Sequence, residues 1–180
     1  MNVAKIMSKS LVTVQVNDSL RTIKKIFDSG HFHHLLVVEE VGDEAEKEAC
    51  KPEADLPHKP RFTPKLPEIL TSFVDPPVSG KLIGVISDRD LFKALSPNIG
   101  TDAETRRDIA TLKKKAHQIM TKNPVTLTTS AGIYDAVRIF NRHSISCIPV
   151  VDENSSPVGI ISWRDILRVL ENNRKQKNPE

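Results

Sequence analysis

The sequence predicts an α/β protein made of two similar units that share one core. Residues 84–95 read Gly-Val-Ile-Ser-Asp-Arg-Asp-Leu-Phe-Lys-Ala-Leu, and residues 159–170 repeat six of these twelve at an offset of 75. Upstream, an offset of 113 aligns residues 7–13 with residues 120–126, where Met, Lys, Val and Thr recur. Such repeats indicate duplicated structural units. At roughly 55 residues, each unit is too small for a robust core of its own, so a shared core is expected.

The sequence of the first unit predicts the element order strand, helix, strand, strand, helix. Residues 11–16 are rich in β-branched side chains and predict a strand, and Ser19 follows as a helix N-cap. Apolar residues at helical spacing over 20–27 predict a helix that Gly30 ends. Residues 35–38 form an unbroken apolar run, which is typical of a strand buried on both faces.

An insertion interrupts this first unit. The two offsets differ by 38, which places the extra residues between the second and third strands, at about 41–80. This stretch holds seven of the twelve prolines, and proline disfavours both helix interiors and central strands. We expect an extended surface excursion in which apolar residues such as Phe73 pack back on the body. A loop of this length either has a function or is a tolerated surface insertion without one.

A linker leads to the second unit. Thr101 and Glu104 form a capping-box pattern, and Ile109, Leu112 and Ala116 continue one helical face, which predicts a bridging helix. The second unit then repeats the element order, with a compact turn over 152–156 where the first unit has its insertion. Pro149 favours an edge position, or the local end, for its strand. The predicted organisation is unit one over 1–95, a linker over 96–116, unit two over 117–171 and a polar tail over 172–180.

Composition excludes several protein classes. A net charge of +3 is too small to indicate nucleic-acid binding, and no apolar run approaches the length of a membrane span. The beginning of the sequence lacks the apolar core of a signal peptide. Cys50 and Cys147 show no metal-binding or redox spacing, so both are expected to be reduced thiols in a cytoplasmic protein.

The motifs and their order resemble the cystathionine-β-synthase (CBS) domain family. The resemblance rests on Met-Ser/Thr at the entry of each unit, Val-Thr on the first strand and Gly-x-Ile-Ser-x-Arg-Asp at the end. It covers roughly residues 3–95 and 113–171, outside the insertion, and two units in tandem resemble a stand-alone CBS pair, or Bateman module. The resemblance implies a homodimer that binds AMP, ADP, ATP or S-adenosylmethionine in clefts between its units.

The resemblance also implies ligand-binding residues. The Asp of each Ser-x-x-Asp would bind the ribose hydroxyls, the Ser would bind ribose or phosphate, and the backbone of the first strand would hold the adenine. Basic residues before the second strand would meet phosphate, a position filled by histidines in the first unit and by Ser146-Cys147 in the second. The candidate residues are Val12, Thr13, His33, His34, Ser87, Arg89 and Asp90 in the first unit, and Val125, Thr126, Ser162, Arg164 and Asp165 in the second.

Each of these residues also has a purely structural interpretation. Ser-x-x-Asp is a capping-box variant that stabilises a helix without any ligand. The two arginines either reach phosphates or are solvated. His31, His33 and His34 either contact phosphate or lie on an ordinary surface, because strand spacing gives a metal no third fixed ligand. Trp163, which replaces Asp88 of the first copy, either stacks on a base or covers apolar surface.

The sequence therefore predicts a non-catalytic regulatory module that senses an adenosine-containing ligand and signals to a separate protein. No nucleophile pattern or Walker-type glycine loop is found, so an enzyme is not expected. The first rival function is a ligand-free interaction scaffold, in which the Ser-x-x-Asp turns are only caps. A second rival, nucleic-acid binding, would use the basic stretches 113–115 and 174–177. A third is the regulatory half of an enzyme or transporter.

Overall fold

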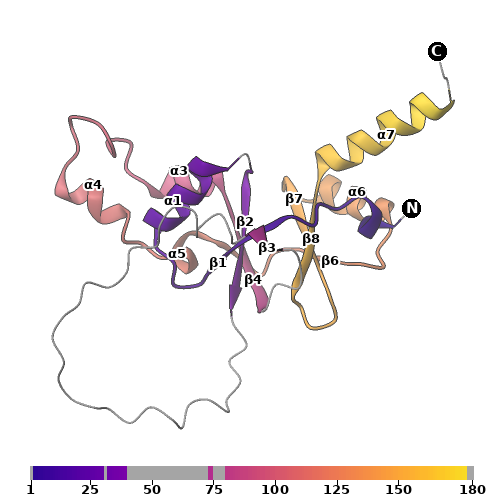
Figure 1. Ribbon diagram of the computed structural model, residues 1–180, viewed down its shortest axis with the longest axis horizontal. Helices are drawn as coiled ribbons and strands as arrows, with labels where there is room; N and C mark the ends of the chain where they lie inside the picture. Colours follow the sequence, from indigo (N-terminus) through magenta and orange to yellow (C-terminus); the bar gives the residue numbers. More distant parts are fainter. Residues whose placement is uncertain (1, 31, 40–72, 75–79, 178–180) are drawn as a thin grey trace, which may run out of the picture.

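The structure is a computed structural model that describes residues 2–30, 32–39, 73–74 and 80–177 (Figure 1). The first unit consists of β1 (Leu11–Gln15), α1 (Leu20–Ser29), β2 (His34–Glu39), β4 (Lys81–Ser87) and α3 (Asp88–Ala94). The second consists of β6 (Leu127–Thr128), α6 (Ile133–Arg142), β7 (Cys147–Val151), β8 (Pro157–Ser162) and α7 (Trp163–Lys177). The predicted order and the α/β fold class are confirmed in both units.

Both units contain the same strand arrangement. In the first, β1 lies parallel to β2 across the α1 crossover, and β2 is antiparallel to β4. In the second, β6 is parallel to β7, and β7 is antiparallel to β8. The two-residue strands β3 (Phe73–Val74) and β5 (Thr121–Lys122) extend the first sheet to the order β3-β1-β2-β4-β5. β3 therefore pairs with β1 at the sheet edge, and the rest of the insertion lies outside the described residues.

Local sequence explains where the helix α1 begins and ends. The Ser19 side chain accepts a hydrogen bond from the Thr22 amide at 3.3 Å, and Gly30 is the C-cap. Leu20 and Ile23, three residues apart on one face, are fully buried beneath it. The run Leu35–Val38 is buried throughout, as its unbroken apolar character predicts.

The entry segments of the two units are exchanged. The short 3₁₀ helix Val3–Lys5 packs Val3 into the core of the second unit, together with Leu127 and Ile148. Ser8 exchanges two backbone hydrogen bonds with Ile160 of β8, at 2.9 and 3.0 Å. The equivalent entry of the second unit, α5 (Ala116–Ile119) followed by β5, packs against the first unit. Each unit is thus completed by a segment that precedes the other.

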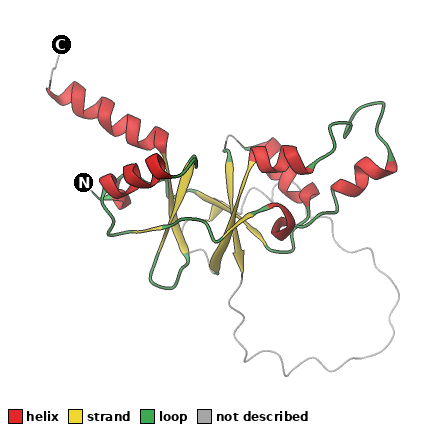
Figure 2. Cartoon of the chain, turned by 180° about the vertical axis from the view of Figure 1, so that it is seen from behind, coloured by secondary structure: helices red, strands yellow, loops and turns green. Residues whose placement is uncertain are grey.

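A third apolar cluster joins the units. Its buried members come from both sheets: Leu11, Leu36, Val38, Leu82 and Val85 from the first, with Cys147 and Val151 from the second. Figures 1 and 2 show the two sheets side by side at the centre of the molecule. The predicted sharing of a core is therefore confirmed, because residues of both sheets bury the same cluster.

Cys147 is a free thiol in this shared core, and burial raises its pKa to about 12. Because the thiolate is the reactive form, we expect the folded chain with Cys50 replaced by serine to react with Ellman's reagent at pH 8 about a thousandfold more slowly than an exposed cysteine. The same chain in urea serves as the control and should react at the ordinary rate. Rapid reaction of the folded chain would contradict the burial of this side chain.

Two predictions about the chain between the motifs are wrong. The capping box lies at Thr105 and Asp108, not at Thr101 and Glu104, and the bridging segment is divided into α4 (Arg106–Thr111) and α5. Thr101 instead donates its hydroxyl hydrogen to the Asn98 carbonyl in a turn, because the Thr-x-x-Asp motif that begins four positions later, at Thr105, forms the cap.

The prediction for Pro149 is also wrong, because β7 is the central strand of the order β6-β7-β8. Pro149 pairs with Ile160 of β8, whereas β6 pairs only with Val150 and Val151. β6 begins only at Leu127, opposite Val150 and one position beyond Pro149, so it does not need the missing amide hydrogen of Pro149. Among the described residues, no helix is both long enough and apolar enough to cross a membrane.

Candidate functional site

The first Ser-x-x-Asp turn joins β4 to α3, and its side chains form a closed hydrogen-bonded ring. The Asp90 carboxylate accepts hydrogen bonds at Oδ2 from the Ser87 amide at 3.0 Å and from the Ser87 hydroxyl at 2.6 Å. Ser87 Oγ in turn accepts from the Asp90 amide at 3.2 Å. The structural interpretation of the motif is therefore realised, since this is a complete capping box. Asp90 Oδ1, however, accepts no hydrogen bond from the described residues.

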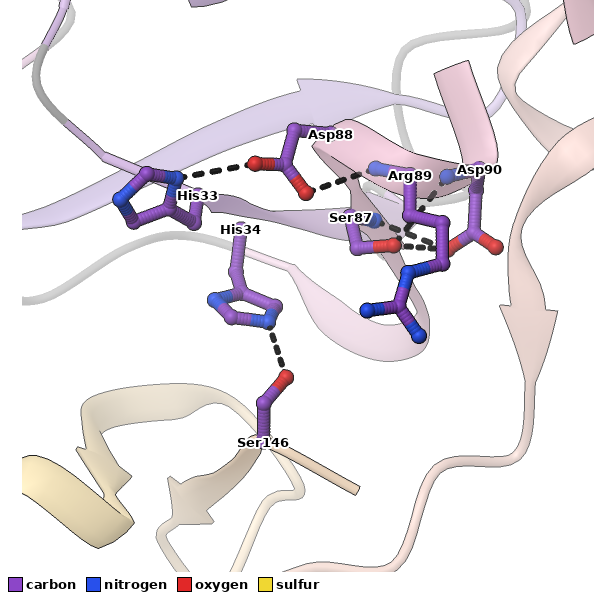
Figure 3. A network of polar contacts seen from close by, with 7 residues as sticks. All are labelled: His33, His34, Ser87, Asp88, Arg89, Asp90 and Ser146. Carbon is purple, nitrogen blue, oxygen red and sulfur yellow. Dashed lines mark hydrogen bonds and ion pairs between the residues drawn. The ribbon is translucent and has the colours of Figure 1, made fainter. Parts of the chain in front are cut away.

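Two histidines at the start of β2 lie beside this turn (Figure 3). His34 stands opposite Ser87 in the register of β2 and β4, and His33 Nδ1 donates to Asp88 Oδ2 at 2.9 Å. His34 Nε2 lies 2.8 Å from the Ser146 hydroxyl, a contact that joins the first unit to the second. Burial lowers the pKa of His34 more strongly than the charge of Asp88 raises it. His34 is therefore neutral near pH 7.

The second turn repeats the two hydrogen bonds from the serine to the aspartate carboxylate, in different surroundings. Asp165 Oδ2 accepts from the Ser162 amide at 2.8 Å and from the Ser162 hydroxyl at 2.7 Å. Its second oxygen, Oδ1, accepts from Arg168 at 3.2 Å, unlike Oδ1 of Asp90. The Arg164 guanidinium lies 5.5 Å above the ring of Trp163, so the tryptophan contacts a cation of its own helix.

The strand residues of the candidate set differ between the units. Thr13 of β1 pairs with Leu36 of β2. Along the strands, Val12 and Thr13 therefore lie one and two residues from the level at which His34 faces Ser87. Val125 and Thr126 are exposed and precede β6, which begins only at Leu127. The first unit therefore gathers its candidate residues at one end of the strands β1, β2 and β4, whereas Val125 and Thr126 of the second unit lie outside β6.

A surface cavity of about 310 Å³ adjoins the first turn, between α1 and α3. His33 and Asp88 belong both to its wall and to the polar network in Figure 3. The remaining lining is mostly apolar and includes Phe27, Leu91 and Phe92. Within the described parts of the chain, no three His, Cys, Asp or Glu side chains gather as metal ligands.

Sequence reasoning missed two members of this network. Asp88 was noted only as the residue that Trp163 replaces, although it is the first variable residue of the Ser-x-x-Asp motif itself. Ser146 aligns with His33 at the offset of 113, but a contact across 112 residues leaves no periodic signal in the sequence.

Comparison with known proteins gives a consistent result. The family model of the CBS domain matches residues 3–46 and 116–172. A CBS domain-containing protein of Dictyostelium discoideum is 25% identical over 169 residues, which cover 93% of this chain and 90% of the relative. The chain spans only 15–29% of several longer relatives, each of which matches about half of it.

Solved structures share the fold. The CBS domain pair of protein MJ0100, in complex with 5′-methylthioadenosine and S-adenosyl-L-methionine, has a TM-score of 0.60 at 24% identity, and the match covers 94% of this chain and 99% of that one. CBSX2 in complex with AMP, a protein of Arabidopsis thaliana, has a TM-score of 0.61 at 18% identity, covering 96% and 98%.

Proposed function

The chain belongs to the CBS domain family, and from that premise we propose that it is a non-catalytic regulatory module that binds an adenosine-containing ligand. The candidate ligands are AMP, ADP, ATP and S-adenosylmethionine, to which the MJ0100 complex adds 5′-methylthioadenosine. In this proposal the ligand lies between the units and biases their relative geometry, which a separate protein reads. A ligand shifts such an equilibrium only through its different affinity for the two geometries.

Each candidate residue has a role in this proposal. In the first unit, Asp90 accepts the ribose hydroxyls, Ser87 and Arg89 lie beside the 5′ substituent, and the Val12-Thr13 backbone faces the adenine. His33 and His34 form the wall on the β2 side. The corresponding residues of the second unit are Val125, Thr126, Ser162, Arg164 and Asp165.

The observation that carries the proposal is that the two oxygens of the Asp90 carboxylate have different hydrogen-bonding environments. Oδ2 closes the helix cap, while Oδ1 has no hydrogen-bond partner among the described residues. A ribose diol can donate to Oδ1 without breaking the cap, as acidic residues bind ribose in other nucleotide folds. In the second unit Arg168 would first have to move away from Asp165 Oδ1. We therefore assign the primary site to the first unit.

A homodimer is part of the proposal. Phe92 of α3 and Leu167 of α7 occupy equivalent repeat positions, and their side chains are 75% and 52% exposed. Exposed apolar side chains at matching positions of two helices favour a protein partner. A ligand-free scaffold is the second candidate function, because the serine of each turn is already hydrogen-bonded to its aspartate without a ligand.

Thermal unfolding in the presence of AMP, ADP, ATP, S-adenosylmethionine and 5′-methylthioadenosine, with GTP as control, tests the proposal. A ligand at about a hundred times its Kd adds roughly 2.7 kcal/mol to the free energy of unfolding. For a chain of this length, the midpoint should then rise by about 5–10 °C. A rise with an adenosine ligand and not with GTP is the expected result. No rise with any ligand at millimolar concentration would leave the scaffold as the function.

A further inference from the structure

Asp88 holds a fixed negative charge at the edge of the first site. Its carboxylate is positioned at both oxygens, by His33 Nδ1 at 2.9 Å from Oδ2 and by the Arg89 amide at 2.7 Å from Oδ1 (Figure 3). Partial burial raises the pKa of Asp88, but the hydrogen bonds from His33 and Arg89 and the electrostatic effect of the two neighbouring histidines together outweigh it and hold the pKa below its ordinary value. Asp88 is therefore ionised at neutral pH and is oriented before any ligand arrives.

The charges around the first turn do not favour an anion. Two carboxylates, Asp88 and Asp90, stand against one guanidinium, that of Arg89, while His34 is neutral. With His33 neutral the network carries one net negative charge, and with His33 protonated it reaches only zero. On α1, which faces the same cavity, Lys24 is already paired with Asp28.

The second turn has the opposite balance. The residue at the position of Asp88 is Trp163, so a neutral ring replaces a carboxylate. Arg164 and Arg168 then stand against the single carboxylate Asp165, and Arg168 is in direct contact with it. In the first unit the counterpart of Arg168 is Lys93, which forms no ion pair with Asp90 among the described residues. The exchange of Asp88 for Trp163 thus accounts for one of the two charges by which the turns differ, and the pairing of Arg168, but not of Lys93, with the aspartate accounts for the other.

We propose that Asp88 makes the first site select adenosine ligands without a phosphate, neutral or cationic at the 5′ position, over phosphorylated ones. This selectivity rests on the proposed function. A phosphate placed beside Ser87 would bring its negative charge toward a carboxylate that hydrogen bonds hold in place, whereas a thioether or sulfonium would not be repelled. Specificity of this kind comes from the repulsive group rather than from an added contact.

The proposed selectivity departs from the expectation that His33 and His34 meet phosphate. Both rings lie beside the turn, but one nitrogen of each ring is already hydrogen-bonded within the protein, to Asp88 for His33 and to Ser146 for His34. A neutral His34 offers a phosphate no charge. The histidines are thus better suited to positioning Asp88 and joining the units than to binding an anion.

Calorimetric titration with 5′-methylthioadenosine and AMP tests this inference. The parent chain carries Asp165→Asn, which weakens the second site, and Asp88→Asn is added to it. We expect the parent to favour 5′-methylthioadenosine, and the added change to shift the ratio of the two affinities toward AMP on the order of tenfold, as for unit charges about 10 Å apart at an effective dielectric constant of about 20. A change that only perturbs structure would weaken both ligands and leave the ratio unmoved.

Two further measurements make the test independent of that variant. Raising the salt concentration from about 0.05 to about 0.5 M should strengthen AMP binding by the parent, because salt screens a repulsion. Asp28→Asn, which removes a carboxylate of the same cavity outside the network, should leave the affinity ratio unchanged. AMP binding as tight as 5′-methylthioadenosine in the parent, or an unmoved ratio after Asp88→Asn, would overturn the selectivity while the proposed function stands. Binding of neither ligand, with no thermal shift by ADP, ATP or S-adenosylmethionine either, would overturn both.

Discussion

Replacement of Val3 by aspartate is expected to lower the free energy of unfolding by about 4 kcal/mol, since a buried apolar side chain is lost and an unpaired carboxylate takes its place. Val3 is fully buried in the cluster of the second unit, beside Leu127 and Ile148, although more than a hundred residues separate it from that unit in the sequence. Urea denaturation followed by circular dichroism measures the change.

Lys5→Asp is the matched control for this prediction. It introduces the same carboxylate two residues away, on an exposed position of the same short helix, and should change stability by less than about 0.5 kcal/mol. If Val3→Asp were as mild as Lys5→Asp, the entry segment would not be part of the core of the second unit, and the exchange of entry segments would be wrong.

The exchange of entry segments marks the limit of what the sequence predicts here. The repeat at 84–95 and 159–170 predicts both turns correctly, because the strand, the N-cap and the helix are all specified within twelve residues. It cannot reveal that Ser8 pairs with Ile160, since alternation along a strand identifies a buried face but not the sheet to which the strand belongs. The same reason hides the contact between His34 and Ser146.

Competition between local signals explains the errors in the linker. Thr101 and Glu104 fit the capping pattern, and so do Thr105 and Asp108, but only the second pair precedes a helix. At Pro149 a local signal is overridden instead. Proline disfavours central strands, but Pro149 is accommodated in one because the short β6 pairs only with Val150 and Val151. In both cases the outcome depends on neighbours that are distant in sequence or on a nearby rival motif.

Asp90→Asn is expected to reduce the affinity for the adenosine ligand by about a hundredfold, whereas Asp165→Asn should reduce it by less than about threefold. The first change weakens the acceptor of two ribose hydroxyls, each a hydrogen bond to a charged group worth about 1.5 kcal/mol or more. The second falls in the site where Arg168 already occupies the free oxygen. Titration calorimetry of both variants with the ligand found in the thermal screen measures the two affinities.

Stability without ligand separates this prediction from the structural role of the motif. Both aspartates accept hydrogen bonds from the amide and the hydroxyl of the preceding serine, so both substitutions should cost a similar amount, about 1 kcal/mol, when no ligand is present. A ligand effect confined to Asp90→Asn, with matched losses of stability, would assign the working site to the first unit. Equal losses of affinity in both variants would show instead that the turns act alike, and that the free Oδ1 of Asp90 does not decide where the ligand binds.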